Sequence, residues 1–191
     1  MKKYWLTAAA LIFIVSFSQA QFYRGILPGS GNFGDSLSKI IVDFKSNFRN
    51  IQGDAIPQQM NTDIYESKIT LPGTTQNYIM RSHSANDTMA TWQAMVYHGE
   101  DYDKALKLYK STFHKIKNSA IRLSDRSVAH FNGKLNNERH ASFVTSSLTV
   151  DIGDANYKKF VADVEMVSNF LTYEVHINLH VKNDDDLTPD D

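Results

Sequence analysis

The sequence predicts an α+β fold in which an antiparallel sheet carries two amphipathic helices on one face. Residues 37–51 and 102–116 both place apolar side chains at i, i+3, i+4, i+7, i+11 and i+14, a spacing that lines one face of an α-helix. Short runs of alternating or β-branched residues separate and follow these two stretches. Runs of strands interrupted by single helices are typical of α+β proteins with antiparallel sheets.

The two helical stretches match at polar positions as well as at apolar ones. Acidic or hydroxyl residues, which cap helix N-termini, precede both stretches. One interpretation is the duplication of a helix-plus-three-strand unit; the alternative is that any two amphipathic helices share an apolar stripe. The polar residues that recur at the same offsets are Lys39, Lys45 and Ser46 in the first stretch and Lys104, Lys110 and Ser111 in the second.

Residues 1–20 have the features of a signal peptide. Two lysines precede an apolar segment at 4–17, and Ser18 and Ala20 are small residues at the positions that a signal peptidase reads. The apolar segment is short for a membrane span, and the alternative to cleavage is an uncleaved N-terminal anchor. We therefore expect export to the periplasm or the extracellular space, cleavage after Ala20 and no stable membrane insertion afterwards.

Composition limits the partners and the chemistry of the protein. The chain has no cysteine, which excludes thiol catalysis and disulfides, and which in an exported protein is typical of the bacterial envelope. The formal net charge is −1, so there is no basic excess to bind nucleic acid. We expect a flexible lead-in at 21–34, a single domain at 35–182 and a disordered acidic tail at 183–191.

The first helix is expected to end before Gly53, and three strands follow it. Residues 63–71 and 76–82 flank the turn that Pro72-Gly73 predicts, whereas residues 88–98 form a strand that is apolar on both faces. Such a strand is central in its sheet or covered by helices on one side.

The second half of the chain is richer in strands. Asn132-Gly133 predicts a turn, and Ser168-Asn169 predicts the turn of a C-terminal hairpin. The strands expected around these turns are 120–123, 127–131, 141–150, 157–167 and 171–181.

The last of these strands has the clearest alternation in the chain. One of its faces is apolar, and the other consists of Glu174, His176, Asn178 and His180. These four residues are the candidate binding surface, on the face of the sheet away from the helices. The alternative is that they form the solvated face of an edge or outer strand.

No pattern in the sequence assigns a cofactor or a metal ion. His176 and His180 share a strand face but lie about 13 Å apart at roughly 3.3 Å per residue, which is too far to bind one ion. His130 and His140 flank the predicted Asn132-Gly133 turn without a placed carboxylate. We therefore predict no metal site.

Catalytic residues are not assigned either. Nucleophile motifs such as G-x-S-x-G are absent. Carboxylates on the predicted strands leave a glycosidase-like pair open, although the chain is short for a sugar cleft. These carboxylates are Glu66, Asp163 and Glu165.

We predict a non-enzymatic binding or protein-interaction domain of the bacterial envelope, with an unknown protein or small molecule outside the cytoplasm as its partner. The first alternative is a small extracytoplasmic hydrolase with a histidine or carboxylate base, centred for instance on His130 and His140. The second is a self-assembling structural protein whose exposed last strand pairs edge to edge.

Overall fold

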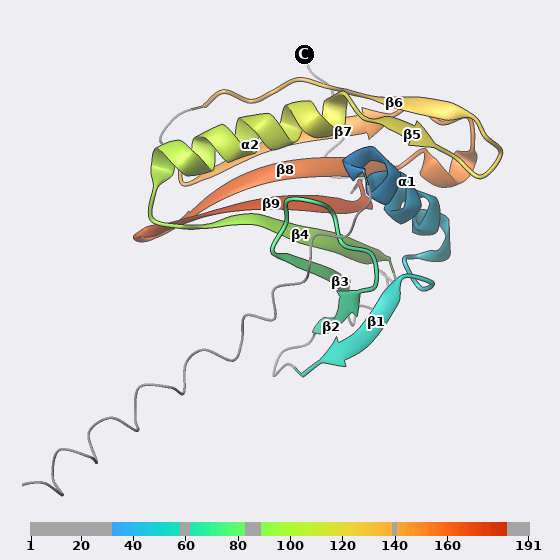
Figure 1. Cartoon of the computed structure of the whole chain (residues 1–191), viewed down its shortest axis with the longest axis horizontal. Helices are drawn as coiled ribbons and strands as arrows, with labels where there is room; N and C mark the ends of the chain where they lie inside the picture. Colours follow the sequence, from blue (N-terminus) through green and yellow to red (C-terminus); the bar gives the residue numbers. More distant parts are fainter. Residues whose placement is uncertain (1–31, 58–61, 83–88, 139–140, 183–191) are drawn as a thin grey trace, which may run out of the picture.

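The computed structural model describes residues 32–57, 62–82, 89–138 and 141–182. Within these residues the chain forms two α-helices, two short 3-10 helices and one antiparallel sheet of nine strands, so the α+β class is confirmed (Figure 1). The elements in chain order are α1 (Phe33–Asp43), η1 (Phe44–Ser46), β1 (Gln52–Ile56), β2 (Thr62–Ser67), β3 (Gln76–Ser82), β4 (Ala90–Gly99), α2 (Tyr102–Lys117), β5 (Ala120–Arg122), β6 (Val128–Gly133), β7 (Phe143–Val150), η2 (Ala155–Tyr157), β8 (Phe160–Asn169) and β9 (Thr172–Val181).

The strand order across the sheet is β1-β2-β3-β4-β9-β8-β7-β6-β5, and neighbouring strands are antiparallel. Each half of the chain therefore forms a contiguous half-sheet, and the two halves meet where β4 pairs with β9 (Figure 1). Because β9 also pairs with β8, the expectation that the last strand is an exposed edge available for self-assembly is wrong. Strand β4 is an interior strand, as its two apolar faces indicate.

One hydrophobic core joins both helices to the sheet. Helix α2 contacts β4, β8 and β9, whereas α1 contacts β5. Trp92 and Leu179 at the centre of the sheet are fully buried in the same core as Leu37 of α1 and Tyr109 of α2. Burial of these large apolar side chains is the main source of stability for such a fold.

The helices begin at residues that can cap them. In α2 the side chain of Asp101 accepts a hydrogen bond from the backbone N–H of Lys104, as its position before the apolar stripe predicts. Helix α1 begins earlier than expected, at Phe33, and its cap is Asn32, whose side chain accepts from the N–H of Gly34.

The first helix is shorter than its apolar spacing predicts. It ends at Asp43 and continues through η1 into Asn47 and Phe48, which have left-handed φ values of 54° and 57°. The Asp43 carboxylate accepts hydrogen bonds from the backbone N–H groups of Asn50 and Ile51. These bonds stabilise the non-helical segment that follows η1. Phe48 and Ile51 still reach the core. Strand β1, which was not expected, begins at the next residue.

Of the two turns predicted from glycine-containing pairs, the structure contains one and not the other. The Pro72-Gly73 turn is confirmed: Gly73 has a φ of 93°, and the N–H of Thr74 donates to the carbonyl of Leu71. The Asn132-Gly133 turn is wrong, because both residues belong to β6 and pair with β7. The reversal between β6 and the antiparallel β7 lies after Gly133. A separate reversal joins β5 to β6, where the N–H of Leu123 donates to the carbonyl of Ser127.

The C-terminal hairpin is confirmed, but its turn lies two residues beyond Ser168-Asn169. Asn169 pairs with Thr172, so Phe170 and Leu171 form the tip. Phe170 has a left-handed φ of 55° and is fully exposed. A bulky residue at this position costs about 1–2 kcal/mol relative to glycine, and the long β8–β9 ladder offsets that strain.

No helix among the described residues is long and apolar enough to cross a bilayer. The predicted signal peptide at 1–20 and the predicted acidic tail at 183–191 lie outside the described residues.

Gly133 is a position where the close approach of two strands requires glycine. A Cβ atom there would clash with the backbone carbonyl oxygen of Ser147, which cannot move without breaking the β6–β7 ladder. We therefore expect Gly133→Ala to lower the free energy of unfolding by about 2 kcal/mol, measured by urea denaturation.

Gly153→Ala is the matched control, since a Cβ at Gly153 has no atom within 4 Å. It should change the free energy of unfolding by less than ~0.5 kcal/mol or stabilise slightly. Equal losses in the two variants would mean that the close contact with Ser147 is not the cause.

Candidate functional site

A set of polar side chains occupies the face of the sheet opposite the hydrophobic core. On β9, Val175, Ile177 and Leu179 belong to the core, so the alternate residues point to the other face. The antiparallel register places polar residues of β4, β7 and β8 beside them. We call this set the polar face; its members are Gln93, His98, Thr145, Asp163, Glu165, Glu174, His176, Asn178 and His180.

The register arranges the centre of the polar face in two cross-strand rows. The rows are Thr145, Glu165 and His176, and, two residues along the strands, Asp163, Asn178 and Gln93. Neighbours within a row lie on adjacent strands about 5 Å apart, and the rows are roughly 7 Å apart along the strands. Residues from four strands, distant in the sequence, therefore converge on one small area.

The four sequence-predicted residues of β9 lie on this face, but the face is not simply solvated. His176 and Asn178 are only 9% and 7% exposed, because β4 and β8 flank β9 on both sides. Among the carboxylates considered from the sequence, Asp163 and Glu165 lie on the polar face. Glu66 lies on β2, four strands away from β8, so it does not join them.

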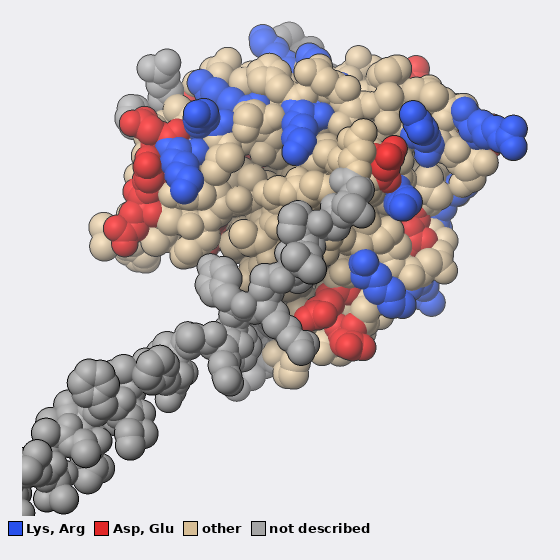
Figure 2. All heavy atoms as spheres, in the orientation of Figure 1, with Lys and Arg blue, Asp and Glu red and all other residues tan. Residues whose placement is uncertain are grey.

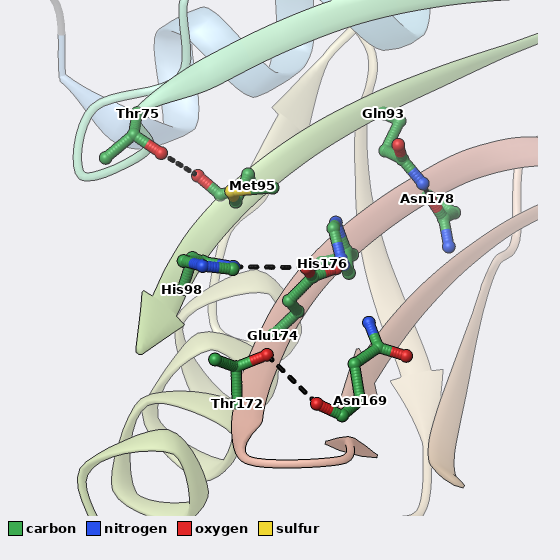
Figure 3. A network of polar contacts seen from close by, with 9 residues as sticks. All are labelled: Thr75, Gln93, Met95, His98, Asn169, Thr172, Glu174, His176 and Asn178. Atoms are coloured by element: carbon green, nitrogen blue, oxygen red, sulfur yellow. Dashed lines mark hydrogen bonds and ion pairs between the residues drawn. The ribbon is translucent and has the colours of Figure 1, made fainter. Parts of the chain in front are cut away.

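Glu174 lies between two histidines. Its Oε1 is 3.1 Å from His98 Nδ1, and its Oε2 is 2.9 Å from His176 Nε2 (Figure 3). Because a carboxylate only accepts hydrogen bonds, the ring proton of His176 lies on Nε2. The hydrogen bond from His176, followed by the one from His98, holds the pKa of Glu174 below its usual value.

A bulge in β4 brings His98 to this position. The register between β4 and β9 shifts between Met95 and Tyr97, so that Val96 is the extra residue. Beyond the bulge Tyr97 pairs with Val175 on the core side, and His98 pairs with Glu174 on the polar face.

His180 forms an ion pair with Asp163. Its Nε2 is 2.8 Å from Asp163 Oδ2, and its Nδ1 is 2.9 Å from the carbonyl oxygen of Val181. Both partners only accept hydrogen bonds, so both ring nitrogens carry protons and the ring is an imidazolium. The hydrogen bond to Asp163 raises the pKa of His180 and outweighs the opposing effect of burial.

Glu165 is at the centre of the polar face. Gln93 Nε2 donates to Asn178 Oδ1 at 2.8 Å, and the Asn178 side chain in turn hydrogen-bonds to Glu165 (Figure 3 shows Gln93 directed at Asn178). Burial, followed by the charge of Asp163, raises the pKa of the Glu165 carboxyl group, and the hydrogen bond from Asn178 only partly offsets this.

Three polar atoms on this face have no hydrogen-bond partner. Thr145 Oγ1, Asp163 Oδ1 and His176 Nδ1 are buried, and they are the only such side-chain atoms in the described part of the chain. Buried polar atoms in native proteins are nearly always paired, since an unpaired one costs about 1–3 kcal/mol. Their concentration on three adjacent strands identifies a place where further hydrogen bonds are available.

The geometry does not suit a metal ion. Within residues 32–57, 62–82, 89–138 and 141–182, no group of three or more histidine and carboxylate side chains can hold one. His130 lies exposed on β6, on the same side of the sheet as the polar face but beyond the β6–β7 pairing, and His140 is outside the described residues.

The sequence predicts the β9 residues and offers Asp163 and Glu165 of β8 as candidate carboxylates, but it does not predict that they share one network or that residues of β4 and β7 belong to it. One signal was available: Asp163 and Glu165 interrupt an otherwise apolar strand. Carboxylates are rarely buried without a partner, so two of them in an interior strand indicate a polar network. In β4 the alternation of apolar and polar-face residues shifts by one position between Ala94 and Tyr97, and such a shift likewise indicates a bulge.

Comparison with protein-family models, curated proteins and solved structures finds no match to this chain.

The His180–Asp163 pair predicts a pH dependence of stability. A pKa of His180 that is raised above 6.5 means that the folded protein binds the proton more tightly than the unfolded chain. The stabilisation is complete below about pH 6.5 and is lost as the pH rises through the folded-state pKa. The free energy of unfolding, measured in urea between pH 6 and pH 9, should therefore fall with rising pH across that window.

Asp163→Asn should flatten this slope and lower the pKa of His180, measured by NMR titration of the ring, because the charge that favours the imidazolium is removed. Asp151→Asn, which changes an exposed carboxylate after β7, should keep the wild-type slope. A wild-type His180 that titrates at or below pH 6.5 would contradict the ion pair.

Proposed function

We propose that this protein is an exported, non-enzymatic binding domain whose ligand site is the polar face, centred on Thr145, Asp163, Glu165 and His176. The observation that carries the proposal is the cluster of three buried, unpaired polar atoms on adjacent strands. The basic and apolar residues of positions 1–17, followed by Ser18-Gln19-Ala20, support the export part of the proposal.

A ligand is the natural partner for these atoms. Each unpaired atom could be removed by a small change such as threonine to valine, and its retention costs stability in the free protein. A bound molecule that pairs with all three recovers that cost on binding. The surrounding hydrogen bonds of Glu174, Asn178 and His180 hold the site on rigid strands. Because the three unpaired atoms are shielded from solvent, a ligand pairs with them after a covering side chain rotates.

A carboxylate-based hydrolase is the second candidate. Burial raises the pKa of Glu165, which places a protonatable carboxyl group beside Asp163. His180 does not support this candidate as a base, because both its ring nitrogens are engaged with acceptors and no lone pair is free. Turnover of an ester or glycoside that disappears in Glu165→Gln would favour hydrolysis over binding alone.

We also infer that the two halves of the chain derive from a duplicated unit, with both helices on one face of the sheet. Each half is a helix followed by consecutive strands, and the last strands of the halves, β4 and β9, pair at the centre. This arrangement supports a unit of one helix and at least four strands, which is larger than the helix-plus-three-strand unit that the sequence suggested.

Thr145→Val tests the proposed site through two opposite effects. Removal of a buried hydroxyl that has no partner should raise the free energy of unfolding of the ligand-free protein by about 1 kcal/mol. The same change should weaken ligand binding. Urea denaturation measures the first effect. Native mass spectrometry of protein purified gently from the cells that produce it measures the second, as loss of a co-purified molecule.

Thr149→Val is the matched control. Thr149 lies on the same strand and the same face but is exposed, and its hydroxyl donates at 3.4 Å to the carbonyl oxygen of Asn132. It should give no gain in stability and no loss of ligand. A Thr145→Val protein that is destabilised, or that retains the ligand as the wild type does, would count against the polar face as the binding site.

A further inference from the structure

The free hydrogen-bonding positions of the polar face are mostly acceptors. Asp163 Oδ1 is a carboxylate oxygen, which only accepts. His176 donates its Nε2 proton to Glu174, so its buried Nδ1 carries a lone pair. No acceptor among the described residues lies within hydrogen-bond distance of Nδ1 to receive a proton there. The Thr145 hydroxyl can donate or accept. A ligand for this site must therefore bring donors.

The charges on the face also favour a cation. None of β4, β7, β8 and β9 contains a lysine or an arginine, whereas the face carries Asp163, Glu165 and Glu174. The imidazolium of His180 forms its ion pair with Asp163 and makes only a weaker, longer-range contribution at Glu165. Glu174 has hydrogen bonds from two histidines, and Glu165 has one from the neutral Asn178. A negative excess thus remains next to the unpaired atoms.

The spacing of the acceptors distinguishes between kinds of cation. Metal ligands must converge to within about 2.0–2.6 Å of one point. Here the side chains that carry the acceptors start from strands about 5 Å apart and from rows roughly 7 Å apart, and no group of three or more histidine and carboxylate side chains in the described residues could hold a metal ion. Several N–H groups on one molecule can reach acceptors that are separated in this way.

We propose that the polar face binds an organic cation, a primary ammonium or a guanidinium group, whose N–H donors pair with Asp163 Oδ1, Glu165 and His176 Nδ1. This inference rests on the proposed function and specifies the chemical class of its ligand. Two sources share this chemistry: a free amine, and a lysine or arginine side chain of a partner protein.

A set of probes of equal length tests the charge requirement. Putrescine, butane-1,4-diol and succinate present a dication, a neutral diol and a dianion on the same four-carbon frame. Agmatine adds a guanidinium group, and the peptide acetyl-Gly-Arg-Gly-Lys-Gly-amide represents a partner's side chains. Each is titrated into the full mature chain, and the ring resonances of His176 are followed by NMR. Glu165→Gln removes a charge without a change of shape.

We expect saturable shifts of His176 with putrescine or agmatine and none with the diol or with succinate. Glu165→Gln should weaken that binding at least tenfold. Glu66→Gln is the control, because it removes a carboxylate from a distant strand of the same sheet, and it should leave the affinity unchanged. Binding of the peptide without the free amines would also support the inference and would assign the cation to a protein partner.

Shifts caused by the diol or succinate, without shifts from the amines, would overturn the cation inference and leave the polar face as a binding site. Absence of any shift from all five probes would likewise overturn it. The proposed function is judged separately, by the retention of ligand in Thr145→Val and Thr149→Val.

Discussion

The pairing of β4 with β9 is the contact on which the rest of this molecule depends. In the described residues it is where the two half-sheets join. On the core side it places Trp92 opposite Leu179, and on the other side it places Gln93 opposite Asn178. The last two residues are 85 positions apart in the sequence, so local propensity cannot bring them together. Burial of the apolar side stabilises the pairing, and the polar side is then aligned as a consequence.

The two faces of the central strands have different roles. The core side contains large apolar residues and supplies the stability. Partly buried ion pairs such as His180–Asp163 add only a modest, pH-dependent stability, because desolvation of the charges opposes their attraction. They also fix the orientation of each side chain. The groups that stay unpaired are consequently held in defined positions by neighbours that are fully engaged, as His176 is held by Glu174.

Local patterns in the sequence predict the class of fold, both helices, the C-terminal hairpin and the core positions. Phe48 and Ile51 show where such patterns fail. Their spacing correctly predicts that both side chains are buried, but they reach the core through a non-helical segment that Asp43 stabilises, and not through a continued helix. The alternation in β9 identifies its polar residues, and it cannot show that β4 and β8 shield them from water. Strand order and register are non-local, so the partners of these residues on other strands were not predicted.

The bulge at Val96 determines how this region tolerates a change in chain length. In a regular ladder, loss of one residue moves every later side chain of the strand to the opposite face. Without Val96, Tyr97 would follow Met95 directly and still point to the core, and His98 would still meet Glu174. A deletion that would exchange the two faces elsewhere in β4 therefore preserves the polar face at this one position. Loss of one residue is therefore compatible with both faces of the sheet at this position, and incompatible with them along the rest of β4.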